Sequence, residues 1–111
     1  MRFDDYKSGA ILVAKVLDGR IAADVAPRFK EALIEYVAQG NRAIVLDLSD
    51  VTFIDSSGLG ALIASLKVIG PDGELVLSGA QETVMSMFKL TRMNKVFRMF
   101  SDVDAAIAAL S

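Results

Sequence analysis

The chain has 111 residues, a length that predicts a single domain over residues 1–111. It contains no cysteine and no histidine, which excludes disulfides, thiol nucleophiles, Cys/His zinc sites and Ser-His-Asp triads. The formal net charge of −2 gives no general attraction for nucleic acid, and no apolar run approaches the ~18 residues of a membrane-spanning helix.

Apolar patterning predicts elements in the order β-β-α-β-α-β-α-β-α, which defines an α/β domain. Strands are expected over residues 3–6, 11–17, 43–48, 74–77 and 96–100. Helices are expected from about residue 22 or 24 to 39, from the residues after 55 to a turn at 70–73, over 81–89, and from about 102 to 110. The run at 43–48 is apolar almost throughout, as in a central strand that is covered on both faces.

Residues that begin helices support these boundaries. Pro27 fits only in the first turn of a helix, which places the start of the first helix near Asp24 or slightly before it. Ser101 is the expected cap of the last helix, with Asp104 at the capping-box position. Residues 8–9 read as a turn that joins the first two strands into a hairpin.

Two serines stand where the central strand is followed by the second helix, in the sequence Asp55-Ser56-Ser57-Gly58. Side chains of Asp and Ser make good caps because their oxygens accept hydrogen bonds from the free N–H groups of the first helical turn. Those N–H groups and the positive end of the helix dipole also favour an anion. Spacing alone leaves two interpretations open: a pair of helix caps without chemistry, or a modification site at one serine, beside which Ser57 is the expected structural cap.

The run F-I-D-S-S-G-L-G at residues 53–60, preceded by V-L-D-L-S-D-V at 45–51, resembles the signature of STAS domains, specifically of the bacterial anti-sigma factor antagonists. Residues 17–29, L-D-G-R-I-A-A-D-V-A-P-R-F, are similar to the strand-turn-helix opening of the same family. The resemblance implies one STAS domain over the whole chain, with a mixed β-sheet and helices packed mainly on one face.

The resemblance also implies a regulatory switch in a partner-switching module. In this family the first serine of the run is phosphorylated by a partner anti-sigma factor that is also a serine kinase; the matching residue here is Ser56, and Ser57 is the alternative. The unphosphorylated form would bind that kinase and free a sigma factor, and a PP2C-type phosphatase would restore the hydroxyl. Such a protein is not an enzyme, needs no cofactor or metal, and acts in the cytoplasm without binding nucleic acid or a membrane.

The residues that contact the partner follow from the same resemblance, which places the loop around Asp18 beside the loop of the two serines. The expected partner-binding residues are Asp18, Gly19, Ile21, Asp55, Ser57, Gly58, Leu59 and Gly60. The two glycines of the helix have a second interpretation, tight packing against the sheet. A glycine inside a helix costs about 1 kcal/mol relative to alanine, which close approach of another backbone can offset.

Two other functions remain open from the sequence. The same fold serves as a non-switching adaptor subunit of transport or signalling complexes, and the intact D-S-S-G-L-G run favours the switch without excluding the adaptor. Carboxylates near strand ends also accept phosphoryl groups or bind Mg²⁺ in receiver domains, and Asp47 or Asp55 would take that role here. The acidic pair at residues 4–5 precedes the strong strand at 11–17 rather than following it, which disfavours the receiver.

A cluster of cations, Arg92, Lys95 and Arg98, lies close to the C-terminal end of the chain. It has two interpretations, a basic patch for nucleotide or lipid headgroups and a solvated face. No Gly-rich phosphate loop and no interleaved aromatic pattern accompanies it, which favours the solvated face.

Overall fold

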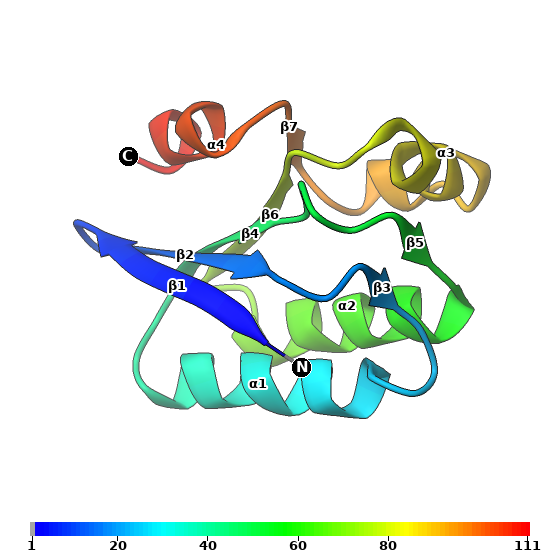
Figure 1. Ribbon diagram of the computed structural model, residues 1–111. Helices are drawn as coiled ribbons and strands as arrows, with labels where there is room; N and C mark the ends of the chain where they lie inside the picture. Colours follow the sequence, from blue (N-terminus) through cyan, green and yellow to red (C-terminus); the bar gives the residue numbers. More distant parts are fainter. Residues whose placement is uncertain (1) are drawn as a thin grey trace.

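The computed structural model describes residues 2–111, and its centre is a five-stranded β-sheet in the order β1-β2-β4-β6-β7 (Figure 1). Its strands are β1 (Phe3–Ser8), β2 (Ile11–Val16), β4 (Ala43–Asp47), β6 (Glu74–Ser78) and β7 (Met99–Phe100). β1 and β2 form an antiparallel hairpin, whereas β2, β4, β6 and β7 run parallel to one another. The predicted hairpin and the mixed sheet are therefore confirmed.

Helices cover both faces of this sheet, but unequally. They are α1 (Ala26–Ala38), α2 (Ser56–Ile69), α3 (Glu82–Leu90) and α4 (Val103–Leu110). The first three contribute Phe29, Leu62 and Phe88 to the main core on one face. α4 covers the opposite face through Ala106, so the expected preference of the helices for one face is confirmed.

The register of the parallel strands explains their continuous apolar runs. Leu12 pairs with Ile44, and both lie in the main core; Val13 pairs with Val45, and both lie in the smaller core under α4. Because successive side chains of a strand point to opposite faces, a strand buried on both faces needs apolar residues at consecutive positions. β2, β4 and β6 meet that requirement and form the rigid centre of the domain.

A second, two-stranded sheet lies beside the main one. Its strands are β3 (Arg20–Ile21) and β5 (Phe53–Ile54), which pair in parallel. Neither strand is predicted from the sequence, because two residues are too few to show an alternating pattern. This small sheet joins the segment before α1 to the segment before α2 (Figure 1).

Two helices begin at different residues from those expected. α1 begins at Ala26 rather than near Asp24, because residues 22–25 form a separate turn before the helix. The cap of α4 is Asp102, whose Oδ1 accepts a hydrogen bond from the N–H of Ala105 at 2.8 Å. The prediction of Ser101 as that cap is therefore wrong.

The last strand is shorter than the predicted strand at 96–100, because only Met99–Phe100 pair with β6. The residues before it form a short 3₁₀ helix, η1 (Met93–Lys95), in the segment expected to be a connection. Phe97 is buried, and its ring packs edge-on against Phe88 of α3 with 6.1 Å between ring centroids. Phe97, which lies within the strand predicted at 96–100, therefore serves as an anchor for the chain after α3.

Candidate functional site

Ser56 and Ser57 occupy the first turn of α2, and both residues are exposed. The cap of this helix is Asp55, whose Oδ1 accepts a hydrogen bond from the N–H of Gly58 at 2.9 Å. The prediction that Ser57 is the structural cap is therefore wrong, since the carboxylate takes that position. Neither hydroxyl serves as the cap, and both lie at the positive end of a 14-residue helix.

The Asp55 carboxylate also holds a second segment in place. Its other oxygen, Oδ2, accepts a hydrogen bond from the N–H of Ala23 at 3.2 Å. Asp55 thus joins the turn before α1 to the start of α2, two segments more than 30 residues apart in the chain. The sequence suggested Asp55 as a cap or as a contact to the kinase, and the structure confirms the cap.

The loop around Asp18 lies beside the loop of the two serines, as the sequence analysis expected. β3 pairs with β5, so that Arg20 is opposite Phe53. The N–H of Thr52 donates to the carbonyl oxygen of Gly19 at 2.8 Å, and the N–H of Asp55 donates to that of Ile21 at 3.3 Å. These backbone bonds make the two loops one continuous surface.

Gly58 is required where α2 meets this small sheet. A Cβ atom at this position would lie 2.1 Å from the carbonyl oxygen of Ile21 and 2.8 Å from Cγ1 of Ile54. Both distances are shorter than any normal contact, so only a residue without a side chain fits. Gly58 therefore lets the helix start approach the backbone of β3 closely.

Gly60 has no such contact. No atom lies within 4 Å of a Cβ added at this position, so the interpretation that Gly60 packs tightly against the sheet is wrong. The residue is exposed and lines a groove of about 390 Å³ between α1 and α2. The residues lining this groove are Ala23, Ala26, Pro27, Lys30, Ser57, Gly60, Ala61 and Ala64.

Other predicted contact residues differ in their accessibility. The side chains of Ile21 and Leu59 are buried in the main core, so they support the surface from below. Asp18 is half-buried, and its Oδ1 accepts a hydrogen bond from the N–H of Arg2 at 3.3 Å. Gly19 is exposed at the edge of the loop.

Phe53 and Arg20 belong to the same surface, although neither is among the predicted contact residues. Phe53 is 43% exposed, and the Arg20 guanidinium carbon lies 5.1 Å from the centre of its ring. An exposed aromatic residue stacked under a guanidinium is a frequent contact point for another protein. The signal available in the sequence is that Phe53 stands two residues before Asp55, the cap of α2. In β5, Phe53 is exposed and Ile54 is buried.

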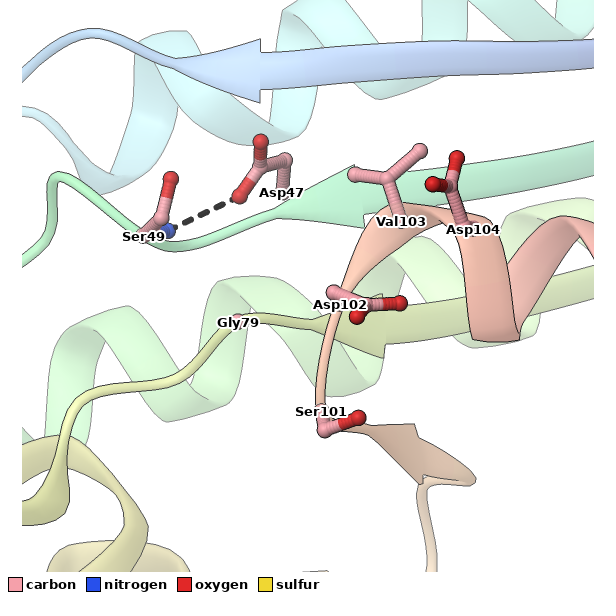
Figure 2. A pocket seen from close by; sticks show the side chains of 7 residues that line it. All are labelled: Asp47, Ser49, Gly79, Ser101, Asp102, Val103 and Asp104. Carbon is pink, nitrogen blue, oxygen red and sulfur yellow. Dashed lines mark hydrogen bonds between the residues drawn. The ribbon is translucent and has the colours of Figure 1, made fainter.

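A second hollow lies at the carboxyl ends of β4 and β6, where Figure 2 shows carboxylates from two parts of the chain. Its volume is about 410 Å³, and its lining residues are Asp47, Ser49, Gly79, Ser101, Asp102, Val103 and Asp104. Asp47 Oδ1 accepts a hydrogen bond from the N–H of Ser49 at 2.9 Å, and Asp102 caps α4. Within residues 2–111, no group of three or more acidic side chains is arranged to hold a metal ion.

Replacing Asp55 by alanine tests its double role. We expect Asp55→Ala to lower the free energy of unfolding by about 2–3 kcal/mol, because it removes a helix cap and a second hydrogen bond between segments. Asp102→Ala, which removes a cap bond from α4, is the matched control and should cost about 1 kcal/mol. Urea unfolding of both variants gives the comparison. Equal losses would contradict the joining role of Asp55.

No helix within residues 2–111 has the length and apolar character needed to cross a membrane. The fold and this surface together define a small mixed-sheet α/β domain that presents two serines at the start of a helix. The family model of the STAS domain matches residues 6–106, and the chain belongs to the STAS domain family.

The chain is similar to several anti-sigma factor antagonists of this family. The anti-sigma-B factor antagonist of Listeria monocytogenes is 32% identical over 82 residues, which cover 73% of this chain and 72% of that protein. The anti-sigma-F factor antagonist RsfB of Mycobacterium tuberculosis is 31% identical over 106 residues, which cover 96% of this chain and 84% of that protein. The crystal structure of an anti-sigma factor antagonist from Mycobacterium paratuberculosis superposes with a TM-score of 0.87 at 27% identity, covering 97% of this chain and 92% of that one.

Proposed function

We propose that this protein is an anti-sigma factor antagonist that acts as the switchable component of a partner-switching module. Its unphosphorylated form binds an anti-sigma factor serine kinase and so releases a sigma factor. Phosphorylation of Ser56 ends that binding, and a PP2C-type phosphatase restores it. The protein is a binding module rather than an enzyme, and it acts in the cytoplasm, where sigma factors bind RNA polymerase.

The observation that carries this proposal is the exposed serine at the start of α2, set in a surface built from two loops. The relatives named above, two of them over 30% identical, support the partner class. Ser56 is favoured over Ser57 because it matches the first serine of the family's D-S-S-G-L-G run, whereas both residues are exposed in the first turn of α2. Ser57 remains the alternative acceptor.

Phosphorylation of Ser56 is compatible with the fold. The kinase would transfer the γ-phosphoryl group of ATP to Ser56 Oγ, with ADP as the leaving group and loss of the hydroxyl proton. The product carries about −1.5 to −2 charges and three acceptor oxygens. A helix N-terminus favours negative charge. The domain therefore stays folded, and the new charge acts on the partner surface that had accepted a neutral hydroxyl.

Phosphate mapping tests this function. The protein is incubated with ATP and each purified anti-sigma factor kinase of the bacterium that carries it, and the tryptic peptide 43–67 is analysed by mass spectrometry. We expect one phosphoryl group on Ser56, lost in Ser56→Ala and retained in Ser57→Ala. The label should survive acid, because a phosphoserine is stable where an acyl phosphate on aspartate is not.

Three outcomes would contradict the assignment of the switch to Ser56. Label on Ser57 would move the switch by one residue. An acid-labile label would favour the receiver interpretation, with Asp47 or Asp55 as acceptor. A peptide that no kinase modifies would favour the non-switching adaptor, and co-purification with a transport ATPase would then identify the complex.

A further inference from the structure

One corner of the molecule concentrates positive charge. Residues 83–101 contain four cations and no carboxylate, although the whole chain has a formal net charge of −2. Arg98 is neutralised by Glu74, with 3.0 Å between Nη1 and Oε2. The other three cations, Lys89, Arg92 and Lys95, form no ion pair with any other part of residues 2–111.

The same corner exposes apolar side chains. Leu90, at the end of α3, is 83% exposed, and Val96, just after η1, is 48% exposed. An apolar centre with a polar rim is the usual arrangement of a protein–protein interface. We define the α3–η1 corner as Lys89, Leu90, Arg92, Lys95 and Val96.

Arg92 occupies a backbone conformation that normally takes glycine. It follows Thr91, the residue that ends α3, and its φ of 60° and ψ of 18° lie in the left-handed region. Every other residue with a positive φ in the described chain is a glycine. A helix commonly ends with glycine at this place because a side chain there is strained. Arg92 thus places a cation at a position where the backbone conformation favours glycine.

Figure 1 shows α3 at the same end of the molecule as β5 and the start of α2, the helix whose first turn contains Ser56 and Ser57. The start of α3 is attached to the residue before β5, because Thr83 Oγ1 donates to the carbonyl oxygen of Thr52 at 3.2 Å. A nine-residue helix spans about 14 Å. A standard interface buries about 800 Å² on each partner, a patch about 30 Å across. One partner protein can therefore cover Ser56 and the α3–η1 corner together.

We propose that the α3–η1 corner is a second docking point for the anti-sigma factor, and that this partner presents an apolar pocket rimmed by carboxylates. Leu90 enters the pocket, and the three unpaired cations meet the rim. The inference rests on the proposed function, since it assigns the corner to the same partner. The hydrogen bond from Thr83 to Thr52 makes the corner continuous with the serine surface, which favours the same protein partner over a lipid membrane, and the positive charge of the corner favours an acidic contact surface on that partner.

Substitution of Arg92 separates binding from folding. Arg92→Gly removes a cation and relieves the left-handed strain, so the melting temperature should stay the same or rise. Affinity for the purified anti-sigma factor, measured by calorimetry, should nevertheless fall about threefold, as for loss of one charge at the rim of an interface. Arg92→Lys keeps the charge and should bind like the wild type. Unchanged affinity of Arg92→Gly would count against the proposal.

A paired charge reversal gives a larger effect. Lys89→Glu with Lys95→Glu should weaken binding about tenfold or more in 0.1 M salt and less in 0.5 M salt, because salt screens exposed charges. The matched control, Arg42→Glu with Lys67→Glu, makes the same change in net charge elsewhere. Lys67 and Lys89 both lie in the last turn of a helix, where the helix dipole stabilises a cation. The variant and its control therefore lose the same favourable interaction.

The apolar centre of the corner is tested separately. Leu90→Ala should weaken binding about tenfold, because a buried apolar anchor dominates such contacts. Val68→Ala, at another exposed apolar residue, should not change it.

The outcomes distinguish the two proposals. If Ser56→Asp abolishes binding while all three corner variants bind like their controls, the corner is not a docking point and the proposed function stands. If the corner variants weaken binding and Ser56→Asp does not, the corner stands and the switch fails. A wild-type chain that binds no anti-sigma factor overturns both. The wild type could also bind anionic phospholipid vesicles, and the double reversal could lose that binding while its affinity for the anti-sigma factor stays unchanged. This result would overturn the proposed docking of the anti-sigma factor and would assign the corner to a membrane.

Discussion

Gly58→Ala should destabilise the domain by about 3 kcal/mol or more, whereas Gly60→Ala, two residues later, should stabilise it by about 1 kcal/mol. The added methyl group at Gly58 would lie 2.1 Å from the carbonyl oxygen of Ile21, which belongs to paired backbone and cannot turn aside. At Gly60 the same methyl group meets no atom within 4 Å. Only the gain in helix propensity remains there.

Urea and thermal unfolding of the two variants give the measurement. A domain of this size has a total stability of about 5–15 kcal/mol, so Gly58→Ala removes a large share of it. Gly60→Ala should raise the melting temperature by about 4 °C. Stabilities that change in the same direction would show that α2 does not meet β3 as described.

Gly60→Ala also bears on the proposed interface. Because the variant is expected to be more stable, any loss of affinity for the anti-sigma factor cannot come from unfolding. A loss would mean that the partner approaches the groove between α1 and α2 closely. Unchanged affinity would leave Gly60 outside the contact and would leave the Ser56 proposal as it stands.

Much of the main sheet could be predicted because its strands carry their own signal. The apolar runs at 11–17, 43–48 and 74–77 correspond to β2, β4 and β6, which are buried on both faces. The two helices with clear apolar spacing, α1 and α2, were also predicted, since burial of one face selects residues at every third or fourth position. These patterns are local, so a single sequence is enough to show them.

The missed features depend on contacts between distant segments. β3 and β5 are two residues each, and pairing of the segments around Ile21 and Ile54 defines them. The hydrogen bond from Ala23 to Asp55 spans 32 residues and leaves no local pattern. The choice between Ser101 and Asp102 as a cap shows the same limit, because both residue types are good caps and only the structure shows that the carboxylate of Asp102 accepts the hydrogen bond from the N–H of Ala105.

The candidate site was predicted in its parts but not in its geometry. The motif at 53–60 located the serines, and the resemblance placed the Asp18 loop beside them. The roles within the motif required the structure: Asp55 rather than Ser57 is the cap, and Gly58 rather than Gly60 makes the close approach. These four residues lie within six positions of the chain, and only three-dimensional packing separates a residue that faces the core from one that faces solvent.

Ser56→Asp should weaken binding to the anti-sigma factor about 100-fold, while Ser56→Ala should bind as tightly as the wild type and resist inactivation by ATP. An unpaired charge placed in an interface costs about 2–5 kcal/mol, and each 1.4 kcal/mol corresponds to about tenfold in affinity. Aspartate carries one charge where phosphoserine carries about 1.5 to 2, so full phosphorylation should weaken binding further.

Folding stability provides the internal check on this prediction. An aspartate in the first turn of α2 lies at the positive end of the helix dipole, so Ser56→Asp should unfold at the same or a slightly higher urea concentration. Weaker binding with unchanged stability would place the effect at the interface. Lys67→Gln, near the far end of α2, changes the net charge by the same amount and should leave affinity unchanged.

The neighbouring serine decides which hydroxyl controls the switch. Ser57→Asp puts the same charge one residue further along the helix, on the side of the groove between α1 and α2. If the partner fits closely over Ser56, calorimetric titration of the three variants should give the largest loss for Ser56→Asp, a smaller loss for Ser57→Asp and none for Ser56→Ala. Tight binding by Ser56→Asp would show that the charge of a phosphoryl group at this position does not drive the partners apart, and the switch would then have to act through another residue.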